Sequence, residues 1–151
     1  LSPTLLHEIR QAIMDKRILI VDDQASIAQF LRDRLEKLGF GVKTATNGVE
    51  GIEILRTESI NGILLNPEMP VMNGLTMLSR LRQMATTVPV IAMSADPTRS
   101  AIIKAIESGA EDYLFKPIFG DILKHKCLRL FSWESGLAYF IGSSDIRMGK
   151  Y

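Results

Sequence analysis

The sequence has 151 residues, enough for one domain with a substantial hydrophobic core. Its 18 basic and 17 acidic residues give a formal charge of +1, which excludes recruitment of nucleic acid or an anionic membrane by bulk charge. A single cysteine, Cys127, excludes an internal disulfide and is typical of a reducing cytoplasm, where we expect this protein. No apolar run reaches the roughly 20 residues that span a bilayer.

Residues 1–16 are predicted to form a helix or linker outside the main domain. From Thr4 to Lys16, five apolar residues recur at helical spacing, namely Leu5, Leu6, Ile9, Ala12 and Ile13. This face is expected to pack on the domain, on another copy of the chain, or to continue an upstream helix. The absence of an initial methionine suggests a fragment of a longer chain.

Residues 17–130 alternate short apolar runs with amphipathic segments. β-Branched runs such as Ile18–Val21 are typical of strands covered on both faces, and Pro89 is expected at the start of its strand or on an unpaired side. Strands are predicted at 17–22, 42–45, 62–66, 88–93 and 112–115, and helices at 23–38, 49–56, 75–84, 96–108 and 119–130. Asp96 or Thr98 is expected to cap the helix that ends near Ser108. This alternation predicts a doubly wound α/β fold with a parallel sheet and helices on both faces.

Residues 131–151 are predicted to form a C-terminal extension or a linker to another domain. Trp133, Tyr139, Phe140 and Ile141 lie among glycines and serines there, which favours a short strand or a hydrophobic anchor. No DNA-binding element is recognised within the chain, so we expect no nucleic-acid partner for it.

Polar residues follow four of the predicted strands, at the end of the sheet where ligands bind in open parallel folds. They are Asp22 and Asp23 after the first strand, Asn66 after the third, Ser94 after the fourth and Lys116 after the fifth. Adjacent carboxylates repel each other unless a cation neutralises them, and oxygen ligands favour Mg²⁺. A hydroxyl and an ammonium facing them could hold phosphoryl oxygens, so the missing component is a carboxylate nucleophile.

With these residues the chain resembles the receiver domains of two-component response regulators. The resemblance extends over residues 17–130 and rests on segments 18–23, 63–74 (ILLNPEMPVMNG), 90–95 (VIAMSA) and 109–117 (GAEDYLFKP). It implies a flavodoxin-like (βα)5 fold with strand order 2-1-3-4-5 and a regulatory, non-enzymatic role in two-component or phosphorelay signalling. It also implies a histidine kinase, another signalling protein or an output domain as partner, with a homodimer possible.

The resemblance implies a role for each residue at the strand ends. Asp22 and Asp23 would bind Mg²⁺, and Glu68 would add its backbone carbonyl. Ser94 and Lys116 would contact the phosphoryl group, and the peptide before Pro117 is expected to be cis and to orient Lys116. Tyr113 matches the switch aromatic, which moves between exposed and buried rotamers.

Asn66 departs from the family, which has the phosphorylated aspartate at this position. An amide has no free oxygen nucleophile, so no acyl phosphate can form on it. The lost charge also weakens Mg²⁺ binding, because one charge pair at about 4 Å is worth on the order of 4 kcal/mol at an effective dielectric near 20.

Three functions therefore compete. The first is a receiver-like module that cannot be phosphorylated and signals through a surface around Ile102, Ala105, Tyr113 and Phe119. The second is an ordinary phosphoaccepting receiver in which an aspartate was changed to Asn66 by engineering. The third is a small flavodoxin-like domain that binds a cofactor in the same crevice, which the missing glycine-rich phosphate loop disfavours.

Overall fold

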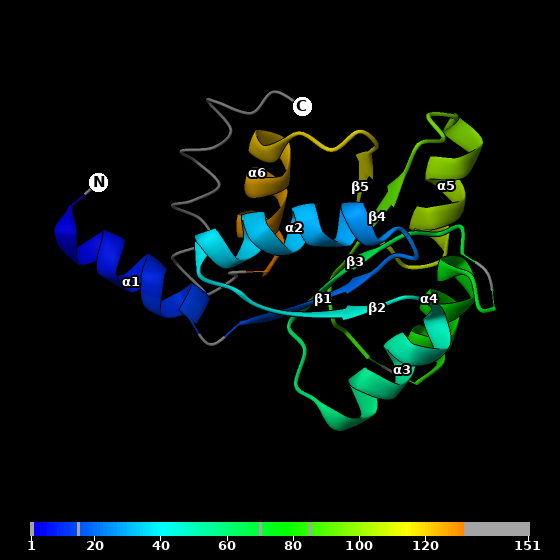
Figure 1. Cartoon of the computed structure of the whole chain (residues 1–151), viewed down its shortest axis with the longest axis horizontal. Helices are drawn as coiled ribbons and strands as arrows, with labels where there is room; N and C mark the ends of the chain where they lie inside the picture. Colours follow the sequence, from blue (N-terminus) through cyan, green and yellow to red (C-terminus); the bar gives the residue numbers. More distant parts are fainter. Residues whose placement is uncertain (1, 15, 70, 85, 132–151) are drawn as a thin grey trace.

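The computed structural model describes residues 2–14, 16–69, 71–84 and 86–131. Its parallel strands form one sheet in the order β2-β1-β3-β4-β5 (Figure 1). The strands are β1 (Arg17–Val21), β2 (Gly41–Ala45), β3 (Gly62–Leu65), β4 (Val90–Ser94) and β5 (Asp112–Phe115). The helices are α1 (Pro3–Met14), α2 (Ala25–Leu38), α3 (Gly48–Thr57), α4 (Gly74–Gln83), α5 (Arg99–Glu107) and α6 (Gly120–Phe131).

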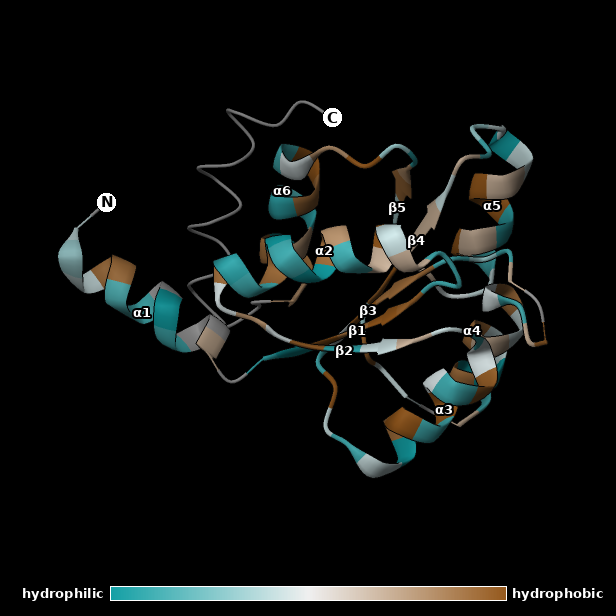
Figure 2. Cartoon of the chain, in the orientation of Figure 1, coloured by the Kyte–Doolittle hydropathy of each residue, from teal (hydrophilic) through white to brown (hydrophobic). Residues whose placement is uncertain are grey.

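The predicted doubly wound fold and its strand order are confirmed. Successive residues of a strand point to opposite faces, so Ile18 and Ile20 of β1 pack with α2 and α6, whereas Leu19 and Val21 pack with α3, α4 and α5. Figure 2 shows the hydrophobic residues concentrated on the inner strands of the sheet. Because β1, β3 and β4 are covered on both faces, their side chains are nearly all buried, as their apolar sequences predict.

Side-chain hydrogen bonds set the starts of two helices. α2 starts at Ala25 instead of Asp23, because the Asp22 carboxylate accepts the Gln24 N–H and turns the chain before the helix. α5 starts at Arg99, and its cap is Thr98, one of the two predicted residues, whose hydroxyl accepts the Ala101 N–H.

The predicted fourth strand, 88–93, also begins too early. β4 starts at Val90, immediately after Pro89, whose ring nitrogen has no hydrogen to donate to the sheet. The Pro89 carbonyl still accepts the Ile63 N–H, so it closes the end of the β3–β4 ladder.

The leading helix α1 ends at Met14, before the predicted Lys16, and extends away from the sheet in Figure 1. No helix of the described part of the chain is long and apolar enough to cross a bilayer. Trp133, Tyr139, Phe140 and Ile141 lie outside the described residues, so the expectations for the tail remain predictions.

The predicted signalling surface is partly wrong. Ala105 and Tyr113 belong to the hydrophobic core, because Ala105 of α5 faces the sheet and Tyr113 of β5 faces α5. Ile102 is half-buried, and only Phe119 of the predicted group is largely exposed, at 65%. We call the exposed hydrophobic residues of this region the α5–β5–α6 apolar surface. They are Ile103, Ile106, Phe115, Phe119 and Ile122.

Candidate functional site

Backbone hydrogen bonds at the carboxyl end of the sheet hold the polar residues in register. The Asn66 N–H donates to the Val21 carbonyl at 2.8 Å, and the Lys116 N–H donates to the Ser94 carbonyl at 2.9 Å. These bonds continue the β1–β3 and β4–β5 ladders by one residue. The side chains that follow the strands are therefore fixed at one edge, as their sequence positions predict.

Asn66 is the centre of this site and is almost fully buried. Its Nδ2 lies 3.3 Å from Asp22 Oδ1 and 3.2 Å from Asp23 Oδ1, and donates to both. Its Oδ1 accepts the Glu68 backbone N–H at 3.1 Å. The Glu68 donor fixes the orientation of the amide, because turning it over would place NH₂ against N–H and oxygen against two carboxylates.

Lys116 supplies the positive charge of the site. Its Nζ donates to Asp22 Oδ2 at 3.0 Å and to Gln24 Oε1 at 2.8 Å, and the Asp22 side chain is inaccessible to solvent. The peptide that joins Lys116 to Pro117 is cis, as the resemblance implies. Lys116 therefore neutralises the carboxylate that the sequence alone leaves without a basic neighbour.

Gln24 is a member of this network that the sequence motifs do not single out. Its backbone N–H donates to Asp22 Oδ1 at 2.9 Å, while its side-chain oxygen accepts from Lys116. The available signal is its position two residues after Asp22 and directly before α2, where a short turn brings both of its polar groups back to the pocket.

Ser94 and Tyr113 lie on the α5 side of the pocket. Ser94 is buried and its Oγ accepts the Asp96 N–H at 3.0 Å, so the hydroxyl is bonded to its own loop. Tyr113 is in a buried position, and its hydroxyl donates to the Asp96 carbonyl at 3.0 Å. Ser94, Tyr113 and Glu68 line one hollow of about 200 Å³.

Asp96 joins these two residues and was not predicted as part of the site. Its N–H, carbonyl and carboxylate each make a hydrogen bond, to Ser94, from Tyr113 and from the Thr98 N–H respectively. Hydrogen bonds from Thr98 hold the pKa of the Asp96 carboxyl below its usual value. Asp96 therefore organises the loop between β4 and α5.

Gly74 lets α4 begin directly against the site. A Cβ at this position would lie 2.2 Å from the Asn66 carbonyl oxygen, a distance that no side chain tolerates. The Gly74 N–H donates to the Pro67 carbonyl at 3.0 Å. The glycine of the 63–74 segment is thus required by the close approach of two backbone segments.

Comparison with known families agrees with this arrangement. The model of the response regulator receiver domain matches residues 18–127. The chain belongs to this family. Among solved structures, a putative response regulator from Chloroflexus aurantiacus resembles this receiver domain with a TM-score of 0.74 and 28% identity, covering 78% of this chain and 98% of that one.

The curated relatives that match are longer proteins. The sensor histidine kinase RcsC of Salmonella typhimurium is 36% identical over 110 residues, which are 73% of this chain and 12% of RcsC. The alkaline phosphatase synthesis transcriptional regulatory protein PhoP of Bacillus subtilis is 35% identical over 104 residues, 69% of this chain and 43% of PhoP. The chain thus spans less than half of these relatives.

Receiver domains typically bind Mg²⁺, which takes oxygen ligands. In this receiver domain the Asn66 NH₂ group lies within hydrogen-bonding distance of both Asp22 and Asp23, and Lys116 contacts Asp22 from another side. The described residues include no group of three or more His, Cys, Asp or Glu side chains placed to hold a metal ion. As arranged, the donors around the two carboxylates do not fit Mg²⁺.

Proposed function

We propose that this receiver domain is a non-enzymatic signalling module that cannot accept phosphate at residue 66 and acts through protein contacts. The observation that carries the proposal is Asn66 at the end of β3, between Asp22 and Asp23. An amide side chain has no free oxygen nucleophile, so it cannot form the acyl phosphate that a carboxylate would form.

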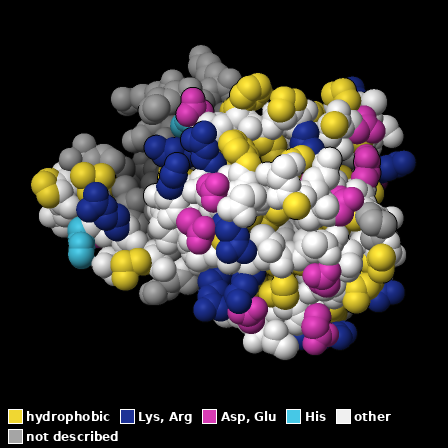
Figure 3. Space-filling model, viewed as in Figure 1, with side chains coloured by type: hydrophobic (Ala, Val, Ile, Leu, Met, Phe, Trp, Pro, Cys, Tyr) yellow, Lys and Arg dark blue, Asp and Glu magenta, His cyan; other side chains and the backbone are white. Residues whose placement is uncertain are grey.

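The α5–β5–α6 apolar surface supports a role in protein contacts. Figure 3 shows hydrophobic side chains along the edge of the molecule where β5, the β5–α6 connection and α5 lie. Phe115, Pro117, Phe119 and Ile122 line a hollow of about 310 Å³ there. Receiver domains interact with histidine kinases or phosphotransfer proteins, and we propose such a protein, an output domain or a second copy as the partner.

Phosphoryl chemistry provides the test. We expect acetyl phosphate, or beryllofluoride, each with Mg²⁺, to leave the NMR signals of Ser94 and Lys116 unchanged. The Asn66→Asp variant is the positive control and should show shifts at both residues. A response of the unchanged chain that reverses when the reagent is removed would refute the proposal.

The stability of the amide is a necessary control. Ordinary deamidation requires attack by the next backbone N–H, which Pro67 lacks, so Asn66 is expected to remain an amide during the experiment. Peptide mass spectrometry checks this within one sample, because the other asparagines all precede glycine, at Asn47, Asn61 and Asn73.

A second candidate function is that of an ordinary phosphoaccepting receiver whose aspartate was replaced by Asn66. The presence of Asp22, Asp23, Ser94 and Lys116 at the same edge favours it, because a pocket without phosphate chemistry has no physical need for all of them. An aspartate codon at position 66 of the encoding gene would establish this candidate, and an asparagine codon would eliminate it.

A further inference from the structure

The pocket has an unusual charge balance for a metal site. Two carboxylates, Asp22 and Asp23, face one ammonium, Lys116, which leaves one negative charge among the contacting groups. A carboxylate in place of Asn66 would leave two, which a divalent cation would neutralise. With the amide, a divalent cation would instead leave an excess positive charge beside the inaccessible Asp22 carboxylate.

The acidic pair already has donors of its own. Asp22 Oδ1 accepts the Gln24 N–H and Asn66 Nδ2, and Asp22 Oδ2 accepts Lys116 Nζ. Asp23 Oδ1 accepts the second bond of the same amide. Both oxygens of the inaccessible Asp22 carboxylate are therefore hydrogen-bonded within the chain.

Binding of a metal ion would disrupt these contacts. Asn66 could offer an oxygen only if its amide turned over, which would break both bonds to the carboxylates and the bond from the Glu68 N–H. It would also bring NH₂ against the Glu68 N–H, so this partly buried donor would lose its acceptor.

We infer that Asn66 and Lys116 together replace the divalent cation, so that the two carboxylates of this receiver domain are held together without Mg²⁺. The inference concerns the same pocket as the proposed function but does not depend on the chemistry of phosphate. The amide bridges the two carboxylates that would hold a metal ion, and the ammonium supplies the charge.

Thermal unfolding and calorimetry with Mg²⁺ alone test this inference. In the unchanged chain, MgCl₂ should shift Tm no more than NaCl of equal ionic strength does. The Asn66→Asp variant should have a lower Tm without Mg²⁺, because a third carboxylate joins the pair, and should regain it when MgCl₂ is added. We expect the unchanged chain to bind Mg²⁺ at least about tenfold more weakly than this variant.

A matched control lies at the other end of the same strand. Asn61 precedes β3 and accepts the Arg17 N–H through its Oδ1, so Asn61→Asp makes the same chemical change away from the pocket and keeps the acceptor. This variant should show no Mg²⁺-specific change of Tm. A gain equal to that of Asn66→Asp would show that any added carboxylate suffices and would overturn the inference.

A second variant isolates the charge. Lys116→Met leaves two unbalanced carboxylates while residue 66 stays an amide, so it should gain a Mg²⁺-specific rise in Tm. Absence of this gain, or Mg²⁺ binding by the unchanged chain as tight as in Asn66→Asp, would refute the inference. Tight Mg²⁺ binding without phosphate uptake would refute this inference and leave the proposed function intact. Phosphate uptake without tight Mg²⁺ binding would refute the proposed function and leave this inference intact.

Discussion

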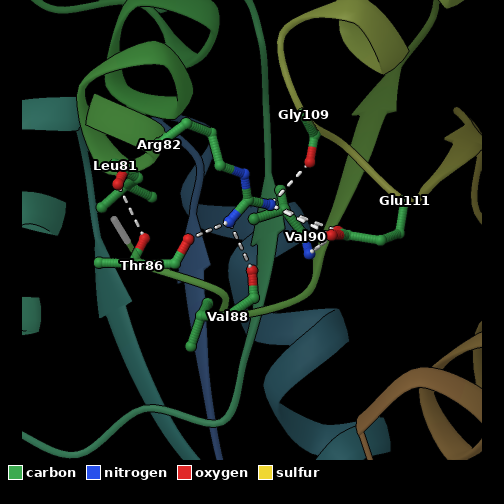
Figure 4. A network of polar contacts seen from close by, with 7 residues as sticks. All are labelled: Leu81, Arg82, Thr86, Val88, Val90, Gly109 and Glu111. Carbon is green, nitrogen blue, oxygen red and sulfur yellow. Dashed lines mark hydrogen bonds and ion pairs between the residues drawn. The ribbon is translucent and has the colours of Figure 1, made fainter. Parts of the chain in front are cut away.

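Two polar networks lie at opposite ends of the sheet and are built differently. At the carboxyl end, side chains bond to side chains around Asn66, at distances of 3.2 and 3.3 Å for its amide. At the amino end, Arg82 of α4 bonds mainly to backbone (Figure 4). Its Nη1 donates to the Thr86 and Val88 carbonyls at 3.0 Å, and its Nη2 donates to the Gly109 carbonyl at 2.6 Å.

Glu111 completes the network at the amino end. One carboxylate oxygen accepts from Arg82 at 3.2 Å, and the other accepts the Val90 N–H at 2.6 Å where β4 begins. The Arg82 guanidinium thus joins α4 to the segments before β4 and β5. Of its acceptors, only the Glu111 carboxylate can be removed by replacing a side chain, because the others are backbone carbonyls. By contrast, most acceptors around Asn66 are side-chain oxygens, which a single replacement can remove.

The difference suggests that the amino end contributes mainly stability and the carboxyl end mainly responsiveness. Arg82 bonds to backbone carbonyls, which are present whatever side chains those residues carry. A cluster of facing side chains near charge balance can respond to a ligand or to a partner, because small changes in charge alter its best arrangement.

The largest expected effect is on the Arg82 network. Arg82→Ala should lower the free energy of unfolding by about 3 kcal/mol, because three carbonyls and Glu111 lose a partly buried donor. Urea unfolding measures it. Arg80→Ala, on the exposed side of the same helix, is the control and should stay within about 0.5 kcal/mol of the unchanged chain.

Arg82→Lys sharpens the comparison. A lysine keeps the charge but has no planar fork, so it should recover less than half of the stability lost in Arg82→Ala. Equal stability of the lysine variant and the unchanged chain would mean that charge alone holds the amino end, and the proposed contrast with the carboxyl end would fail.

The sequence predicted the fold well because its signals are local and repeated. Runs such as Ile18–Val21 are apolar at every position, as expected for a strand that is covered on both faces. The start of α2 was misplaced because the Asp22 side chain competes with the helix for the Gln24 N–H, and periodicity does not detect such a bond.

The carboxyl end was predicted more completely than the amino end. Asp22, Asn66 and Lys116 follow strands directly, so topology brings them together. Arg82 and Glu111 are ordinary charged residues of a helix and a loop, and nothing in their spacing indicates that they meet. Gln24 and Asp96 each act partly through backbone groups, which every residue has, so composition did not reveal them.

A smaller effect is expected at Gly74, where α4 contacts the pocket. Gly74→Ala should cost about 2 kcal/mol, because its Cβ would overlap backbone atoms of Asn66 and Pro67 that cannot rotate away. Urea unfolding gives the loss, and the NMR signals of the Asn66 side-chain amide should shift with it.

Gly120 is the matched control, since it also is the first residue of a helix. Its added Cβ would lie 3.3 Å from the flexible end of Arg34, so Gly120→Ala should change stability by no more than about 0.5 kcal/mol. Similar losses of stability at both glycines would show that any glycine at a helix start contributes this much, and that the close approach to Asn66 is not the cause.

The smallest effect concerns Asp96, whose carbonyl holds Tyr113 at the carboxyl end. Hydrogen bonds from Thr98 lower the pKa of Asp96 from its ordinary 3.8, so the folded chain holds this proton more weakly than the unfolded chain does. The resulting stabilisation is present above the unfolded pKa and is lost as the pH falls through the lowered one. Acid should therefore loosen this loop. The bonds from Arg82 to backbone carbonyls should not change, because carbonyls do not titrate in this pH range.

An NMR titration of the Asp96 carboxyl carbon tests this assignment. Thr98→Ala should raise the pKa of Asp96 towards its ordinary value, because it removes the hydroxyl that contributes most to the shift. Thr98→Ser retains a hydroxyl at the same place and should keep the pKa low. If the pKa of Asp96 stays low in both variants, the backbone N–H of Thr98 alone stabilises the carboxylate. The carboxyl end would then depend on a backbone donor, much as the amino end depends on backbone acceptors.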